Sequence, residues 1–540
     1  MRGSEVATFT YDGSLVTADA RHGSLETTLS WGYDNDFRPT SFTYAGGTVS
    51  YGYDADSLLT HAADYAISHD ASNGLPTAVS APGFTLARGF SPYGELDDTT
   101  MTVAGTAAYG YSLTRDNSGR ITSRTERIGG EARTLGYAYD LLGRLTTVTC
   151  GGDVVEAYRY DANGNRTHAT VPARGVDSTM TFDTADCIAT SAEATYTTDA
   201  DGFVTSKETS AGTTTYRYSA LGELTTVSVP SGHTITYAYD AFSRRVSRSV
   251  DGTLTDRYLW ADATHLLAVY PAEGTTPTYR FAYADGRVPT SVETSAGTLR
   301  LLTDQVGTVR ALVASDGTIS SRVERDSYGA ITSGTAGFPL GFAGGLEDAD
   351  TGLVHFGARE YDPALGRWLS RDPIDFAGGD ANLYGYVLGD PVGWVDPEGL
   401  ETWGFSLPNM NIDGNVVVDG GAQQMFVWDD KGHFGIARTV NFIGYRTNVS
   451  VGQAFLFQHT SRDSICDLNG LGGEKGWSAS PFLRVGPVGV GGGVASEYFW
   501  NDRTNRYDKR GTTVSIGGGA SLSPVDYHEV VSYTWVQQAW

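Results

Sequence analysis

The stretch Tyr137-Ala138-Tyr139-Asp140-Leu141-Leu142-Gly143-Arg144-Leu145 decides the fold, because variants of it recur through roughly the first 330 residues. Each copy runs Tyr-x-Tyr-Asp or Tyr-x-Tyr-Ser, then a turn, then a short segment rich in Leu, Thr and Val. Further copies begin at Tyr51, Tyr158, Tyr216 and Tyr237. The second tyrosines at 139 and 160 are 21 positions apart, as are those at 218 and 239, so the chain repeats a unit of about 20 residues.

Each unit predicts a β-hairpin. Side chains alternate along a strand, so both tyrosines of Tyr-x-Tyr lie on one face, and the Asp-x-x-Gly that follows is typical of a turn. A single hairpin is marginal and buries its face only against its neighbours, so many copies predict one long antiparallel sheet. Strand twist would make that sheet coil.

Two further interpretations of the repeat residues deserve mention. The tyrosines could form a stripe that binds sugar or peptide, but cross-strand aromatic packing is the ordinary role of such residues in sheets and is favoured here. Aspartates such as Asp140, Asp161 and Asp240 could bind calcium, although turn formation explains them better. We predict no metal site and no cofactor.

Composition excludes several classes of protein. The 540 residues carry a net charge of −25, which argues against nucleic-acid binding by the repeats, since phosphate binding needs clustered Lys and Arg. No run of about 18 apolar residues predicts a transmembrane helix. Met1-Arg2-Gly3-Ser4 lacks the apolar segment of a secretory signal and leads straight into the repeats, so we interpret the chain as part of a longer protein.

A different segment follows the repeats, dense in Tyr, Gly, Arg and Asp-Pro. It runs from Gly357 through Arg359, Asp372-Pro373 and Asn382-Leu383-Tyr384 to Asp396-Pro397-Glu398-Gly399-Leu400. Proline holds the residue before it in an extended conformation, so each aspartate has a defined direction. If Asp372 and Asp396 converge, they can share a proton and split their pKa values, which lets one act as base and the other as acid.

These motifs resemble the core region of RHS/YD-repeat proteins, and the resemblance covers residues 1 to about 400. It implies a fold in which the repeats form a hollow β-shell (1–335), the core plugs it (336–400), and a variable β-rich domain follows (401–540). It also implies an internal aspartyl protease that cuts the chain between Leu400 and Glu401. Arg359 occupies the position of a functional arginine of that family, where it could orient a carboxylate or stabilise an oxyanion.

Some alternatives stay open. Asp362 and Asp390 are rival members of the pair, Arg359 could serve in a structural salt bridge, and Asp375 could perturb the pKa of Asp372. Gly399 would leave room for the backbone to enter the site.

The resemblance also predicts partners. The shell would enclose its own C-terminal domain as cargo, and upstream repeats or a partner subunit would close it; an immunity protein is a further expected partner. Two functions follow. The protein is a self-cleaving, exported shell that carries a toxin, or it is a non-enzymatic surface or adhesion protein, with carbohydrate as one ligand class.

Residues 401–540 lack the repeat pattern. Strands are predicted at 414–419, 424–428, 435–443, 454–457, 485–490, 512–516 and 530–535, with a hairpin turn at 429–432. They indicate a small β-rich domain whose activity the sequence does not indicate.

Overall fold

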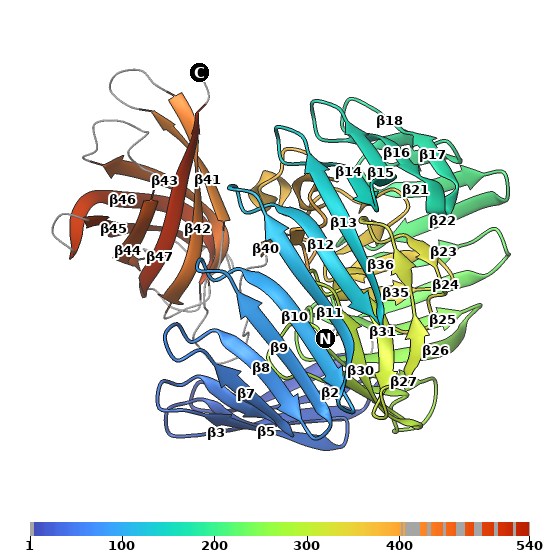
Figure 1. The fold of residues 1–540 in the computed structure, drawn as a ribbon, viewed down its shortest axis with the longest axis horizontal. Helices are drawn as coiled ribbons and strands as arrows, with labels where there is room; N and C mark the ends of the chain where they lie inside the picture. The colour runs from blue at the N-terminus through green and yellow to red at the C-terminus, as the bar shows by residue number, and fades with distance from the viewer. Residues whose placement is uncertain are drawn as a thin grey trace. The chain divides into compact units, whose positions relative to one another are not determined.

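The computed structural model describes residues 5–400 and 403–404, together with seven strands between residues 422 and 538. It divides the chain into two compact units, Met1–Asn409 and Met410–Trp540. Figure 1 shows that strands dominate both units, so the all-β prediction is confirmed. No helix in the described part of the chain is long and apolar enough to cross a membrane.

Two long sheets make up most of the first unit, one of 17 strands and one of 15, and within each the strands pair antiparallel with their neighbours in sequence. The first sheet contains β1 (Val6–Asp12), β2 (Leu15–His22), β3 (Thr27–Tyr33), β4 (Pro39–Tyr44), β5 (Gly47–Tyr53), β6 (Leu59–Ala62), β7 (Tyr65–His69), β8 (Pro76–Ala81), β9 (Phe84–Phe90), β10 (Leu96–Val103), β11 (Thr106–Arg115), β12 (Ile121–Ile128), β13 (Glu131–Tyr139), β14 (Leu145–Cys150), β15 (Asp153–Tyr160), β16 (Arg166–Val171) and β17 (Val176–Thr179).

The second sheet contains β18 (Thr181–Phe182), β19 (Ile188–Thr190), β20 (Ala194–Thr198), β21 (Val204–Thr209), β22 (Gly212–Tyr218), β23 (Leu224–Ser228), β24 (Thr234–Tyr239), β25 (Arg245–Val250), β26 (Thr253–Trp260), β27 (Leu266–Pro271), β28 (Tyr279–Ala282), β29 (Ser291–Thr294), β30 (Gly297–Thr303), β31 (Val309–Ala314) and β32 (Ile319–Arg322). Met180 lies between the two sheets, and its N–H still donates to the Thr167 carbonyl at 2.9 Å. The hairpins therefore form one nearly continuous ribbon.

The turn of each repeat follows from its aspartate. In the unit of Asp140, one carboxylate oxygen accepts from the N–H groups of Leu142 at 2.9 Å and Arg144 at 3.0 Å, and Gly143 takes a left-handed φ of +85°. The other oxygen accepts from the Arg144 side chain at 2.7 Å. Asp140 is thus a turn former, as the sequence favoured.

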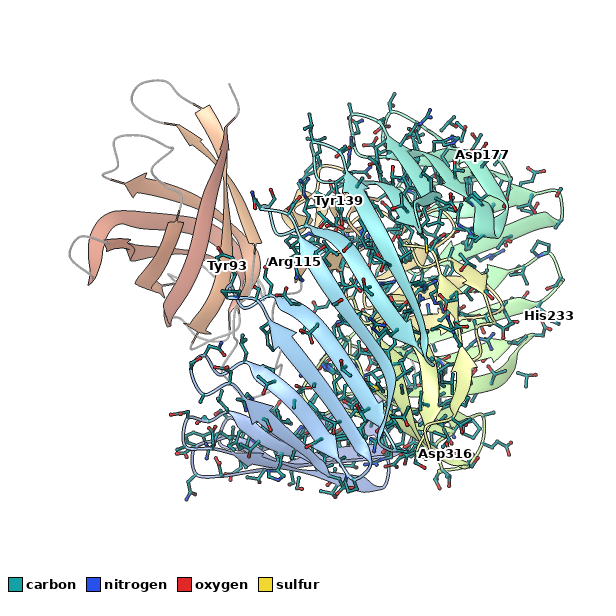
Figure 2. All side chains as sticks on the ribbon, in the orientation of Figure 1. Tyr93, Arg115, Tyr139, Asp177, His233 and Asp316 are labelled. Carbon is teal, nitrogen blue, oxygen red and sulfur yellow. The ribbon has the colours of Figure 1, made fainter. Side chains whose placement is uncertain are left out.

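In several units the second tyrosine ties the unit to the one before. Tyr139 and Tyr160 donate their hydroxyls to the carbonyls of Ile121 and Leu145 at 2.8 and 2.7 Å, and Figure 2 shows Tyr139 on the sheet. The Arg144 guanidinium lies 4.8 Å from the centre of the Tyr160 ring. Equivalent hydroxyl-to-carbonyl bonds are made by Tyr33, Tyr53, Tyr239 and Tyr283. These tyrosines therefore hold neighbouring hairpins together.

The ribbon coils until its beginning meets a later part of itself. Leu29 and Phe42 of the first sheet share a buried cluster with Leu267 and Tyr270 of the second. Nearby, the Tyr44 hydroxyl donates to the Phe281 carbonyl at 2.6 Å.

Residues 324–400 add short elements with an aromatic core. Its members are Val306, Phe342, Ala343, Val354, Phe356, Tyr361, Trp368, Tyr386, Val387 and Val395, all buried. The strands are β33 (Glu324–Arg325), β34 (Ile331–Ser333), β35 (Leu346–Asp348), β36 (Leu353–Phe356), β37 (Arg359–Asp362), β38 (Arg367–Trp368) and β39 (Trp394–Val395). The 3-10 helices are η2 (Phe342–Gly344), η3 (Asp375–Gly378) and η4 (Val387–Gly389). Another 3-10 helix, η1 (Pro172–Arg174), connects β16 to β17. Buried bonds such as Arg245 to Glu360, 2.5 Å, anchor this segment to the sheets.

The second unit is a seven-stranded antiparallel sheet in the order β41-β42-β47-β44-β45-β46-β43. Its strands are β41 (Ala422–Trp428), β42 (Phe434–Arg446), β43 (Ser450–Thr460), β44 (Gly470–Ala479), β45 (Gly489–Asn501), β46 (Arg506–Ser521) and β47 (Val525–Gln538). Five predicted strands fall within β41, β42, β43, β46 and β47. The glycine-rich β44 was not predicted, because glycine hides the alternation of side chains. The predicted strand at 414–419, the turn at 429–432 and most of 485–490 lie outside the described residues.

Candidate proteolytic site

Three short elements bring the predicted site residues together. Arg359 begins β37, Asp372 follows β38, and Asp396 follows β39. Asp372 is fixed on both sides, since its N–H donates to the Leu383 carbonyl at 2.9 Å and its carboxylate accepts from the Ile374 N–H at 2.9 Å. All three side chains are buried, so they meet in a region of low dielectric.

Arg359 joins the two aspartates. The same Nη2 lies 2.9 Å from Asp372 Oδ2 and 2.8 Å from Asp396 Oδ2. Its Nε donates to the carbonyl of Gly399 at 2.5 Å, and its guanidinium lies 4.2 Å from the centre of the Trp368 ring. One planar cation therefore positions both carboxylates and the segment that precedes the predicted cleavage point.

The backbone of that segment is held from several directions. The Leu400 N–H donates to Asp396 Oδ1 at 2.9 Å, and the Glu398 carbonyl accepts from the Ala358 N–H at 2.8 Å. Gly399 has a φ of +67°, and a Cβ there would lie 2.6 Å from the Phe356 carbonyl oxygen. Glycine is therefore required at this position for both conformation and space.

The Leu400 carbonyl oxygen lies near Asp372. A Cβ built on Gly378 would lie 2.7 Å from Asp372 Oδ2 and equally 2.7 Å from the Leu400 oxygen. Both oxygens border the same point, so they are no further apart than twice that distance. Leu400 thus offers its N–H to one aspartate and its carbonyl to the neighbourhood of the other.

The strand after the predicted cleavage point returns to the site. β40 (Trp403–Gly404) pairs antiparallel with β39, with Val395 opposite Trp403. This pairing brings the chain that follows the predicted cleavage point beside the strand that precedes Asp396. Glu401 itself lies outside the described residues.

Burial and charge act on these groups in opposite directions. Burial raises the pKa of Asp372 above its usual value, the negative charge of Asp375 raises it further, and the charge of Arg359 lowers it. Burial also lowers the pKa of Arg359, which the two aspartates oppose. The predicted influence of Asp375 on Asp372 is thus present in the structure.

The rival aspartates have other roles. Asp362 accepts from the N–H groups of Ala364 at 2.9 Å and Leu365 at 3.2 Å. Asp390 accepts from Val392 at 3.2 Å and Gly393 at 3.0 Å, and burial raises its pKa to about 6. Both side chains organise turns, and their bonds in the described structure do not reach Arg359.

The sequence reasoning missed a third carboxylate near the arginine. The charge of Arg359 lowers the pKa of Asp380, although burial, the larger effect, raises it. Asp380 also accepts from the Asn382 N–H at 2.9 Å. The signal that could have drawn attention to Asp380 is its position in a glycine-rich segment, two residues before Asn382-Leu383-Tyr384. Within the described residues, no group of three or more His, Cys, Asp or Glu is arranged to hold a metal ion.

Comparison with known families gives a match to the model described as teneurin YD-shell over residues 3–387. The chain belongs to the teneurin YD-shell family. It is an RHS/YD-repeat protein, and its coiled sheet of tyrosine-rich hairpins is the YD shell.

The relatives of this YD-shell chain are much longer proteins. Teneurin-3 of Mus musculus is 29% identical over 426 residues, which cover 72% of this chain and 15% of that protein. The probable deoxyribonuclease RhsA of Dickeya dadantii (strain 3937) is 27% identical over 422 residues, which cover 72% of this chain and 28% of RhsA.

A solved structure, that of TcdB2-TccC3-Cdc42, has a similar fold. The match covers 73% of this chain and 22% of the chain in that structure, with a TM-score of 0.51 and 17% sequence identity. At that identity the likeness concerns the fold alone. Matches to both teneurins and RhsA leave the function of this YD-shell chain to be argued from its own residues.

Proposed function

We propose that this protein is a self-cleaving YD-shell protein, which hydrolyses its own peptide bond between Leu400 and Glu401 and carries residues 401–540 as an effector. One observation carries the proposal: Arg359 bonds to Asp372, to Asp396 and to the Gly399 carbonyl, beside the Leu400 backbone. A structural salt bridge explains one pairing of Arg359, but it does not explain why the chain that follows Asp396 folds back onto the same guanidinium.

The two aspartates take different parts in the reaction. Asp396, which accepts from the Arg359 guanidinium and from the N–H of Leu400 itself, is the base and takes a proton from the attacking water. Asp372, whose pKa is raised by burial, gives its proton to the Leu400 carbonyl oxygen as the C–O bond to water forms. The proton on Asp396 then passes to the Glu401 nitrogen, the C–N bond breaks, and Asp372 recovers its proton as the Leu400 carboxyl group forms.

The effector and its partners belong to the same proposal. After cleavage, the effector would remain as cargo of the shell, held in part by the pairing of β39 with β40. Upstream repeats or a partner subunit would close the shell, and export to the cell surface or beyond would bring it to its target. An immunity protein would protect the producing cell.

Denaturing mass spectrometry of the purified full chain tests the proposal. We expect two fragments, the smaller beginning Glu-Thr-Trp-Gly, and one intact chain for Asp372→Asn and for Asp396→Asn. Asp362→Asn is the matched control, since it alters a buried turn-forming aspartate of the same segment and leaves the site unchanged. An intact wild-type chain would contradict the proposal. So would fragments from both Asp372→Asn and Asp396→Asn.

The similarity to teneurins favours a second candidate, a non-enzymatic surface or adhesion protein that binds carbohydrate or another ligand. This candidate expects an intact wild-type chain and a ligand bound by its outer face. The mass measurement therefore separates the two.

A further inference from the structure

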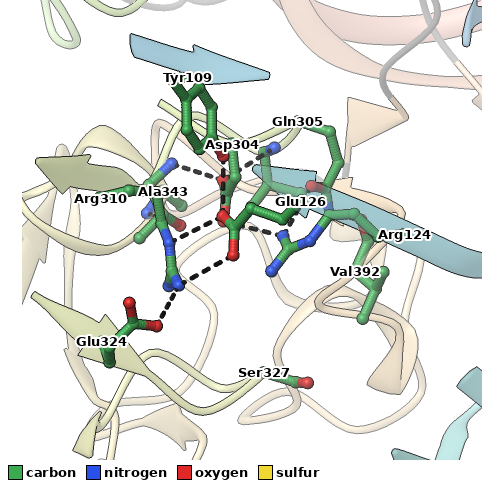
Figure 3. A network of polar contacts seen from close by, with 12 residues as sticks. Tyr109, Arg124, Glu126, Asp304, Gln305, Arg310, Glu324, Ser327, Ala343 and Val392 are labelled. Atoms are coloured by element: carbon green, nitrogen blue, oxygen red, sulfur yellow. Dashed lines mark hydrogen bonds and ion pairs between the residues drawn. The ribbon is translucent and has the colours of Figure 1, made fainter. Parts of the chain in front are cut away.

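A buried polar network connects the wall of the first sheet to the chain that carries Asp396 (Figure 3). Arg124 on β12 donates to Gln305 Oε1 at 2.8 Å and lies 3.2 Å from Asp304 Oδ2. Gln305 in turn donates from Nε2 to the Val392 carbonyl at 3.0 Å. Arg124 and Gln305 are 181 positions apart in the sequence and Gln305 and Val392 are 87 apart, so only the fold brings them together.

Gln305 is itself held rigidly. It lies in the turn between β30 and β31, where Asp304 Oδ1 accepts from the N–H groups of Val306 at 3.2 Å and Thr308 at 2.9 Å. Its side chain is 6% exposed, and the Arg124 side chain is equally buried. Its amide therefore has one orientation: the oxygen faces the arginine and the nitrogen faces Val392.

Val392 stands four residues before Asp396. Asp390, two residues before Val392, closes a turn by accepting from the Val392 N–H, and Val395, directly before Asp396, packs in the aromatic core. The Val392 carbonyl is thus the point at which the sheet wall grips this segment, directly ahead of β39.

We propose that Gln305, oriented by Arg124, is a positioning residue for Asp396, and that it sets the rate of cleavage by clamping the Val392 carbonyl. This inference rests on the proposed self-cleavage and extends it. Small displacements of a reacting group cost about tenfold to a hundredfold in rate, so a clamp on this segment has a measurable effect.

The first test compares two variants that each lose one buried bond to a backbone carbonyl. Gln305→Met removes the donor to Val392, and Tyr44→Phe removes the 2.6 Å bond to Phe281, which does not involve residues 390–400. We expect the cleavage rate of Gln305→Met to be about one tenth of the wild-type rate or lower, and that of Tyr44→Phe to equal the wild-type rate. Urea midpoints measured in an Asp372→Asn background, where cleavage is blocked, show that the variants fold and compare their stabilities.

The second test uses Gln305→Glu, whose carboxyl group can donate to Val392 only when protonated. The charged groups around position 305 include Arg124 on β12 with Glu126 on the same strand, and Asp304 in the same turn. Arg287 donates to the Val306 carbonyl at 3.1 Å, and Asp390 accepts from the Val392 N–H. All of them are unchanged in both variants. Uncleaved full-length chains of both variants are purified at pH 8 and shifted to pH 5.5. The ratio of their cleavage rates, Glu over Met, should rise about tenfold on acidification.

The outcomes separate the two proposals. If the wild-type chain cleaves itself and Gln305→Met cleaves at the same rate, only the role of Gln305 is overturned. The same holds if the ratio of the Gln305→Glu rate to the Gln305→Met rate does not change with pH. An intact wild-type chain would overturn self-cleavage and this inference together.

Discussion

Leu400 donates its backbone N–H to the carboxylate of Asp396 at 2.9 Å, four residues earlier in the chain. The aspartate thereby holds the residue whose peptide bond we propose it helps to cut. The Leu400 carbonyl oxygen lies near Gly378 and Asp372, since a Cβ on Gly378 would be 2.7 Å from both that oxygen and Asp372 Oδ2. The bond from Asp396 to the Leu400 N–H positions the residue before the proposed cleavage point, as efficient cleavage requires.

Gly378→Ala tests this geometry. The new methyl group would lie 2.7 Å from both Asp372 Oδ2 and the Leu400 carbonyl oxygen. Both oxygens would therefore have to move away from the methyl group. We expect cleavage to slow by about a hundredfold in a time course followed on denaturing gels. Gly337→Ala is the control, because a Cβ there meets nothing within 4 Å. Equal rates for both variants would place the Leu400 carbonyl outside the reaction.

Arg359→Lys tests the bridging cation. Lysine keeps the positive charge but presents a point donor, which cannot reach both aspartates and the Gly399 carbonyl in the planar arrangement of arginine. Cleavage should slow by about a hundredfold or more, with the chain still folded by circular dichroism. The exposed Arg217→Lys should leave the rate unchanged. A cleavage rate near that of wild type for Arg359→Lys would mean that Arg359 contributes only its positive charge and that its planar set of donors is not needed.

The pH dependence of cleavage follows from Asp372. Its pKa is raised above the usual 3.8, so the group keeps its proton to a higher pH, and the rate should fall as the pH rises through that pKa. Asp375→Asn removes a negative neighbour, so the fall should move to lower pH. Rates measured on uncleaved chain refolded at different pH values give the profile. A profile for Asp375→Asn that superimposes on that of the exposed control Asp316→Asn would contradict this assignment.

Stability should depend on pH through the buried Glu156, which feels the charge of the buried Asp326. Burial and the charge of Asp326 raise the pKa of Glu156 to about 7 from 4.5. The unfolded chain therefore loses this proton first, and the free energy of unfolding falls between about pH 4.5 and 7.

Glu156→Gln removes that dependence. The variant should be more stable than wild type at pH 8, by on the order of 2 kcal/mol, and similar at pH 4.5, as measured by urea denaturation in the uncleaved Asp372→Asn background. The exposed Glu208→Gln should show no such gain. Equal stability of Glu156→Gln and wild type at pH 8 would mean that Glu156 is already ionised at little cost.

The repeats were predictable because their determinants are local. In the unit of Tyr139 and Asp140, the strand, the turn and the ion pair with Arg144 lie within a few residues of one another. The hydroxyl of Tyr139 reaches a carbonyl only one repeat away, so a period in the sequence becomes a period in the fold. Strand β44 escaped prediction because glycines carry no side-chain pattern.

The sequence by itself determined the coiled sheet of hairpins and identified Arg359, Asp372 and Asp396 as candidates, since repeat and motif are written in neighbouring residues. Only the tertiary structure decided that these three side chains meet and that Asp362 and Asp390 do not join them. It also decided that Asp380 interacts with Arg359 and that Gln305 bonds to the Val392 carbonyl. The physical reason is that such contacts depend on how distant segments pack. Arg124, Gln305 and Val392 lie on separate elements, and burial in a common interior brings their polar groups within hydrogen-bond distance.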